Sequence, residues 1–239
     1  KNRTEATKIA KEYLLNQDFN LDGYQSVAHA ENWMSSDGIP LNKEQNKYVA
    51  YIMENGGKDE LRHFLSEDKL DNMGWAIRFF IPETKREYKV WVSAKGKDNG
   101  IIYFKETLAD TAYVPSLSKE NAQDLVLRFA HKQKIDTVNM DLVDDGLIGK
   151  ENRVDYYFKY KANNHKNNIA EAETYFEFDV YGNHIGMFKT GLKIPEDWLW
   201  TYYKNQTYDT IFIYVALFSA IFIFVLAIRY LMVLLKDKK

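Results

Sequence analysis

The apolar run near the carboxyl end constrains this chain more than any other feature of its sequence. Residues 211–228 (IFIYVALFSAIFIFVLAI) include only two side chains with a polar atom, those of Tyr214 and Ser219. A helix of this length extends roughly 27 Å, close to the thickness of the hydrocarbon core of a bilayer. Core helices of soluble proteins rarely lack a polar face over such a length. The run therefore predicts one transmembrane helix at residues 210–235.

The flanks of this helix predict its orientation. Segment 196–209 is aromatic and net acidic, and segment 236–239 is basic. Aromatic rings settle at the level of the lipid headgroups, and basic flanks stay in the cytoplasm. We therefore expect residues 1–207 to be extracytoplasmic, whereas the opposite topology, a tail-anchored cytoplasmic domain, is disfavoured by the same rule. The predicted membrane-interface residues are Trp198, Trp200, Tyr202, Tyr203, Tyr208, Arg229, Lys236, Lys238 and Lys239.

A domain of this size needs a signal to cross a membrane. The chain opens at Lys1 without an initiator Met or an apolar targeting segment. We therefore expect either that a signal peptide was removed or that an upstream transmembrane helix lies outside this sequence.

The composition excludes two classes of function. The sequence contains no Cys, which excludes thiol catalysis and Cys-ligated metal sites. Its net charge of −2 comes from interspersed acids and bases, without the basic stripe that marks a nucleic-acid-binding protein. We expect no nucleic acid among the partners.

The segment before the apolar run contains an internal repeat. Apolar residues follow helical spacing at 6–14 and again at 122–130, where Ser118 is the predicted N-cap. Each predicted helix leads at the same sequence offset into a short extended piece. In both halves, polar and apolar residues then alternate as in antiparallel strands, with Gly and Asn at the turns. The predicted later strands cover 75–81, 88–94, 101–105, 154–160, 174–180 and 184–189.

This pattern predicts an α+β fold of two PepSY- or cystatin-like units, each a helix on an antiparallel sheet of three or four strands, followed by one transmembrane helix. The expected units are residues 1–114 and 115–195. The first unit carries an insertion at about 29–74, with two predicted helices, 43–54 and 58–67, on either side of Gly56-Gly57.

The sequence offers no catalytic or metal-ligating constellation. None of the five His residues lies three or four residues from another His, as helical metal ligands would. It contains no nucleophile elbow, phosphate-binding loop or dinucleotide fingerprint. Asp144-Asp145 is interpreted as solvated charge in a turn. We therefore predict no catalytic residue, metal or cofactor in this chain.

Three charged residues are candidates for binding an anionic ligand or a carboxylate of a partner. Arg78 alternates with large apolar residues on a predicted strand, and Arg153 and Asp155 open the matching strand of the second half. The alternative interpretation is that Arg78 lies on the outer face of the sheet and pairs with a neighbouring strand residue such as Glu87.

Scattered positions along nearly the whole chain give a family resemblance. They are Trp75, Arg78, Phe79, Phe80, Pro82, Tyr88, Val90, the predicted helix from Ser118, Arg153, Asp155, Phe158, the strand at 172–180, Gly182, Pro195 and Trp198. The sequence resembles the amino-terminal region of bacterial CPBP-family proteins, which are intramembrane metalloproteases related to CAAX-processing enzymes. That region lies between a first transmembrane helix and a helical bundle, which binds a catalytic metal through three motifs that this sequence does not contain. The resemblance therefore implies zinc only for a bundle outside this chain.

The leading hypothesis is an extracytoplasmic recognition or regulatory domain, tethered in a bacterial inner membrane, of a CPBP-type metalloprotease. Whether the full protein is an enzyme stays open. A second hypothesis is a non-enzymatic single-pass envelope scaffold that docks a membrane or envelope protein through an exposed sheet edge. A third, weaker hypothesis is a PepSY-style inhibitor of secreted peptidases, for which the sequence marks no inhibitory loop.

Overall fold

The computed structural model describes residues 1–32, 44–66, 73–94, 100–163 and 168–236 and assigns them to two compact units, Lys1–Ile194 and Pro195–Lys239. The helices are α1 (Arg3–Leu15), α2 (Glu44–Ser66), α3 (Lys119–Lys132) and α4 (Glu196–Lys236). The strands are β1 (Gln25–Asn32), β2 (Met73–Phe80), β3 (Glu87–Ser93), β4 (Ile101–Thr107), β5 (Met140–Gly149), β6 (Val154–Ala162), β7 (Glu173–Tyr181) and β8 (His184–Lys193). The predicted α+β class is confirmed.

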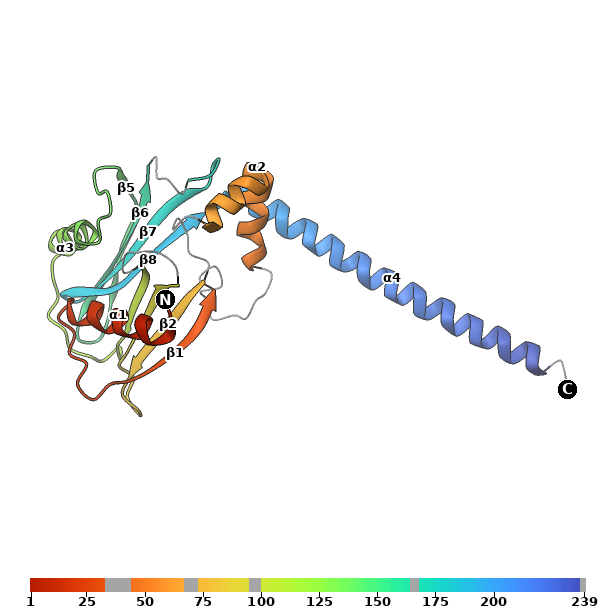
Figure 1. Ribbon diagram of the computed structural model, residues 1–239, viewed down its shortest axis with the longest axis horizontal. Coiled ribbons are helices and arrows are strands. Elements are labelled where there is room, and N and C mark those ends of the chain that lie inside the picture. Colours follow the sequence, from red (N-terminus) through yellow and green to blue (C-terminus); the bar gives the residue numbers. More distant parts are fainter. Residues whose placement is uncertain (33–43, 67–72, 95–99, 164–167, 237–239) are drawn as a thin grey trace. The chain divides into compact units, whose positions relative to one another are not determined.

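All the strands belong to one antiparallel sheet with the order β1-β2-β3-β4-β8-β7-β6-β5 (Figure 1). Apart from α2, which lies between β1 and β2, an order of one helix followed by four strands occurs twice along the chain. The two halves meet where β4 pairs with β8, with Phe104 opposite Phe188. The two predicted halves therefore share one sheet and one compact unit, and a division at residues 114 and 115 stays an interpretation of the sequence.

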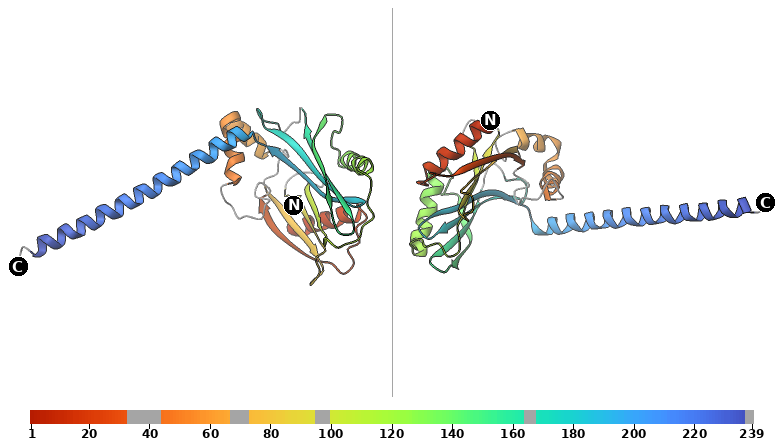
Figure 2. Two further views of the ribbon diagram at one scale, coloured as in Figure 1. Left: turned by 180° about the vertical axis from the view of Figure 1, so that it is seen from behind. Right: turned by 90° about the horizontal axis from the view of Figure 1, so that it is seen from below.

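Helices α1 and α3 cover the same face of this sheet (Figure 2). Helix α1 contacts β1, β2 and β3, and α3 contacts β6, β7 and β8. Asn2 caps α1 in a capping box with Glu5, whose side chain accepts from the backbone N–H of Asn2. Ser118 caps α3, as predicted. The apolar spacing that is visible in the sequence thus places both helices.

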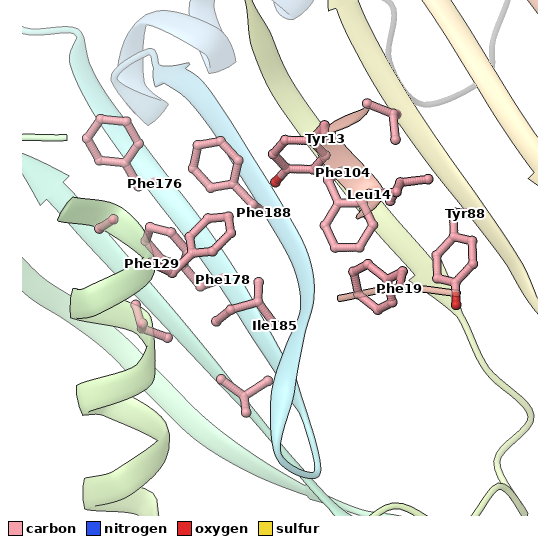
Figure 3. Packing of buried hydrophobic residues seen from close by; sticks show 14 of the residues in the cluster. Tyr13, Leu14, Phe19, Tyr88, Phe104, Phe129, Phe176, Phe178, Ile185 and Phe188 are labelled. Carbon is pink, nitrogen blue, oxygen red and sulfur yellow. The ribbon is translucent and has the colours of Figure 1, made fainter. Parts of the chain in front are cut away.

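Aromatic side chains fill the core between the helices and the sheet (Figure 3). Phe104 is fully buried, and its ring centroid lies 5.4 Å from that of Phe19. In the second half, Phe178 stacks on Phe188 at 5.4 Å, and Phe129 of α3 lies 5.6 Å from Phe188. All five belong to one buried cluster, so the hydrophobic core is continuous across the two halves.

The insertion in the first half contains helix α2. Both predicted helices are present within α2, and the chain between them departs from helical geometry at Gly57, where φ is 71°. Glycine adopts this left-handed conformation without the steric cost that a Cβ would add. Strand β1 continues to Asn32, so the inserted segment begins after that residue. Tyr51 and Ile52 of α2 are buried, and the Tyr51 hydroxyl donates to the carbonyl of Ile169 at 3.4 Å.

Helix α4 makes up most of the second unit. It is the one described helix that is long and apolar enough to cross a membrane. Every side chain at 211–229 is exposed. A soluble helix would bury such a surface, so α4 fits a membrane anchor.

Candidate functional site

Arg78 is exposed on β2 and is engaged by its neighbouring strand. Its Nε donates to Oε2 of Glu87 on β3 at 2.7 Å, and its guanidinium lies 4.9 Å from the ring centroid of Phe80. This is the strand pairing that the alternative interpretation predicted. An exposed pair of this kind contributes about 0–1 kcal/mol to stability. A role of Arg78 in ligand binding stays a prediction.

Arg153 and Asp155 form a buried ion pair at the start of β6. The Nε of Arg153 lies 3.0 Å and 3.1 Å from the two carboxylate oxygens of Asp155. Arg153 Nη1 also donates to the carbonyl oxygens of Ala109 at 2.8 Å and Ala112 at 3.0 Å. Asp155 Oδ1 accepts from the backbone N–H of Gly182 at 3.1 Å. The pair therefore ties residues 108–118, which we call the inter-half segment, to β6 and to the β7–β8 turn.

Gly182 allows this connection at the β7–β8 turn. Its φ of 61° lies in the left-handed region, and a Cβ at this position would lie 2.5 Å from Cγ1 of Val114. The backbone N–H of Leu117 donates to the Gly182 carbonyl at 3.1 Å. A residue with a side chain would therefore push the inter-half segment away from the turn.

Arg153 and Asp155 line a cavity of about 250 Å³ beside β4 and β7. Lys105, Asp179 and Tyr181 also line it, whereas Arg78 is not among the described residues that do. Of the three predicted ligand-binding residues, the structure brings Arg153 and Asp155 together and places Arg78 elsewhere on the sheet.

Asp179 in this cavity has an unusual proton affinity. Burial raises the pKa of its carboxyl from 3.8 to about 6, although the positive charge of Lys105 opposes the shift. Because the folded state binds this proton more tightly than the unfolded state, the free energy of unfolding is highest below about pH 4 for this group. It falls as the pH rises through about 6.

We expect Asp179→Asn to stabilise the protein above this range. A shift of about two units corresponds to at most about 3 kcal/mol, and partial access of solvent reduces the gain to on the order of 1–2 kcal/mol at pH 7.5. The gain should shrink towards pH 4, because the wild-type carboxyl is then neutral. Urea unfolding at pH 7.5 and at pH 4 measures this gain in the free energy of unfolding. The control is Asp124→Asn, at an exposed position. A gain that is equal at the two pH values would contradict this assignment.

A further buried charge, which is not among the predicted site residues, lies on β4. Glu106 is fully buried, and its Oε1 accepts from Arg86 Nε at 3.1 Å. Its other carboxylate oxygen lies 2.6 Å from Nε2 of His184, a residue of the second half. A carboxylate can only accept, so this imidazole nitrogen carries the proton. Glu106 thus holds a cation and an imidazole in place at the seam between β4 and β8.

Arg86 and His184 open onto a cleft between α3 and residues 16–19, which follow α1. We call it the interhelical cleft. It encloses about 550 Å³. Arg128 and Lys132 of α3 also line it, and Lys132 Nζ donates to the Asn16 carbonyl at 2.8 Å. Its apolar lining consists of Phe19, Leu125, Phe129 and Ile185. The arrangement suits an anionic group with an adjacent apolar part.

Asp144-Asp145 does not lie in a turn, contrary to the sequence interpretation. Both residues belong to β5, at a register shift between Leu142 and Asp144. Asp145 forms an ion pair with Lys119 of α3. The irregular pairing explains why the local sequence resembles a turn. Within the described part of the chain, no group of three or more His, Asp or Glu side chains has a geometry that could hold a metal ion.

The predicted membrane-interface residues are all on α4 except Lys238 and Lys239, which lie outside the described residues. Trp198 stacks on Tyr202 with a centroid separation of 5.0 Å, and Trp200 is 73% exposed. Their depth in a bilayer stays a prediction.

Comparison with known protein families, with curated proteins and with solved structures finds no match to this chain. The CPBP resemblance therefore rests on the residues of the sequence alone.

Proposed function

We propose that this chain is a membrane-tethered recognition or regulatory module. The observation that carries the proposal is the exposed apolar surface of α4 following a compact α+β unit. A helix with this surface is stable in lipid, and the unit that precedes it offers cavities in which a ligand could bind.

The orientation belongs to the same proposal. The basic end of the chain faces the cytoplasm, and Lys1–Ile194 lies on the extracytoplasmic side of a bacterial inner membrane. The asymmetry between the acidic, aromatic approach and the lysines beyond the run supports this orientation.

The partner that the resemblance favours is a CPBP-type catalytic bundle, and in this proposal the two halves are PepSY- or cystatin-like units. The repeated order of one helix and four strands supports the interpretation of the halves as two such units. Any catalytic zinc would belong to the bundle, and the tethered unit would present or recognise its substrate.

Two measurements test the protease assignment. Reading the gene beyond Lys239 should reveal further transmembrane helices with a Glu-Glu-x-x-x-Arg motif. The full-length protein purified in detergent should contain stoichiometric zinc. A gene that continues without such helices, or a full-length protein without metal, would contradict it.

One observation favours the scaffold as a second candidate. β5 is an edge strand of the sheet, and four of its large apolar side chains are exposed: Leu142, Val143, Leu147 and Ile148. An exposed apolar edge can pair with a strand of another protein. A stoichiometric protein partner that survives detergent, and that is lost when Val143 and Leu147 are replaced by Lys, would favour this role.

A further inference from the structure

We propose that the interhelical cleft binds an acidic peptide segment, with Arg128 as the principal carboxylate ligand. The inference specifies the ligand of the recognition role proposed above and does not depend on the protease as partner. It rests on the charge of the cleft, on the way its cations are held, and on its apolar and amide-bearing lining.

Three cationic side chains and one imidazole, from three separate parts of the chain, meet in this cleft. Arg86 precedes β3, Arg128 and Lys132 lie on α3, and the imidazole of His184 comes from β8. Asp18 is the only acidic residue among the described residues that line it. Positive side chains concentrated in a concave surface attract anions and raise their local concentration.

The cationic side chains differ in how many of their N–H donors are already used within the protein. Glu106 accepts from Nε and Nη2 of Arg86, which leaves the Nη1 donors of that guanidinium for a ligand. Lys132 uses one of its three N–H donors on the Asn16 carbonyl. Arg128 is exposed and makes no ion pair or hydrogen bond with the described residues. Its guanidinium is therefore free to take a carboxylate in the bidentate geometry that this group favours.

The remaining lining favours a peptide over a small inorganic anion. Phe19, Phe129 and Ile185 give an apolar wall, which can pack against an aliphatic side chain. Gln17 and Asn183 supply side-chain amides, which pair with both N–H and C=O groups of an extended backbone. A phosphate ion would use the cations alone, whereas an acidic peptide uses all three kinds of surface.

The test uses the full chain in detergent micelles and a fluorescein-labelled peptide, Gly-Asp-Leu-Asp-Gly, with fluorescence anisotropy as the readout. We expect Arg128→Gln to weaken binding about tenfold, since a hydrogen-bonded charge pair is lost. Lys132→Gln should weaken it less. Arg62→Gln, which removes an exposed cation on α2, should leave the affinity within about twofold of wild type.

Four results would overturn the proposal. The peptide could fail to bind, or it could bind Arg128→Gln as tightly as wild type. The analogue Gly-Asn-Leu-Asn-Gly could bind equally well. Inorganic phosphate or phosphatidylglycerol vesicles could displace the peptide at matched anion concentration, which would assign the cleft to phosphate or to lipid headgroups. None of these results changes the membrane tethering or the zinc content of the full-length protein, so they are distinct from a failure of the proposed function.

Discussion

Asp155→Ala should destabilise the Lys1–Ile194 unit by about 3–5 kcal/mol, because it leaves the buried guanidinium of Arg153 without its carboxylate. The substitution also removes the acceptor of the Gly182 N–H at the β7–β8 turn. Both partners are almost completely buried, so water in the cavity that they line would replace the lost interactions only in part. Urea unfolding of the full chain in micelles, followed by tryptophan fluorescence, measures the change.

The matched control is Glu87→Ala, which breaks the exposed pair with Arg78. It should cost at most about 1 kcal/mol, because solvent screens both charges. If Asp155→Ala were as mild as this control, the buried pair would not hold the inter-half segment, and the structural account of Arg153 and Asp155 would be wrong.

Phe104→Ala should destabilise both halves together, by about 3–5 kcal/mol. The ring is fully buried and packs against Tyr13 at 5.8 Å and Phe19 at 5.4 Å. Its strand, β4, pairs with β8 of the second half, with Phe188 opposite. Because the core is continuous across this seam, a cavity in the first half should lower the stability of the whole unit.

Hydrogen exchange followed by mass spectrometry measures the loss of stability in each half separately. We expect peptides of β2 and β3 and peptides of β6 and β7 to lose protection by similar factors in Phe104→Ala. Val138→Ala, at a position that is 89% exposed, should change neither set. Faster exchange confined to the first half would indicate two independent domains and would contradict a common core.

The sequence predicts the local elements well, because their signals are local. The spacing from Ala6 to Leu14 and the cap at Ser118 place α1 and α3. Alternation with a period of two places the central strands, and Gly57 marks the break within α2. Each of these signals depends on residues within one or two turns or on one hairpin.

The non-local pairing could not be predicted in this way. Nothing in the sequence near Phe104 indicates that β4 pairs with β8, which follows it after a whole helix and three strands. The contact between Glu106 and His184 depends on that pairing, so in the sequence His184 is only one of five scattered His residues.

A signal for Glu106 was nevertheless present. Phe104 and Glu106 alternate on β4, which places the carboxylate on the same face as a core residue. A charged residue at such a position needs a buried partner. For Asp144-Asp145 the irregular register of β5 concealed the strand, and a turn was the natural but wrong prediction.

The most direct test of the tethered, extracytoplasmic unit is cysteine accessibility in intact cells. This chain contains no Cys, and the unsubstituted protein, labelled in parallel, measures the reaction of any Cys outside it. With a membrane-impermeant maleimide, Val138→Cys in the folded unit should react in intact cells, and Lys238→Cys should react only after permeabilisation. Labelling of Lys238→Cys but not Val138→Cys in intact cells would invert the topology and contradict the account.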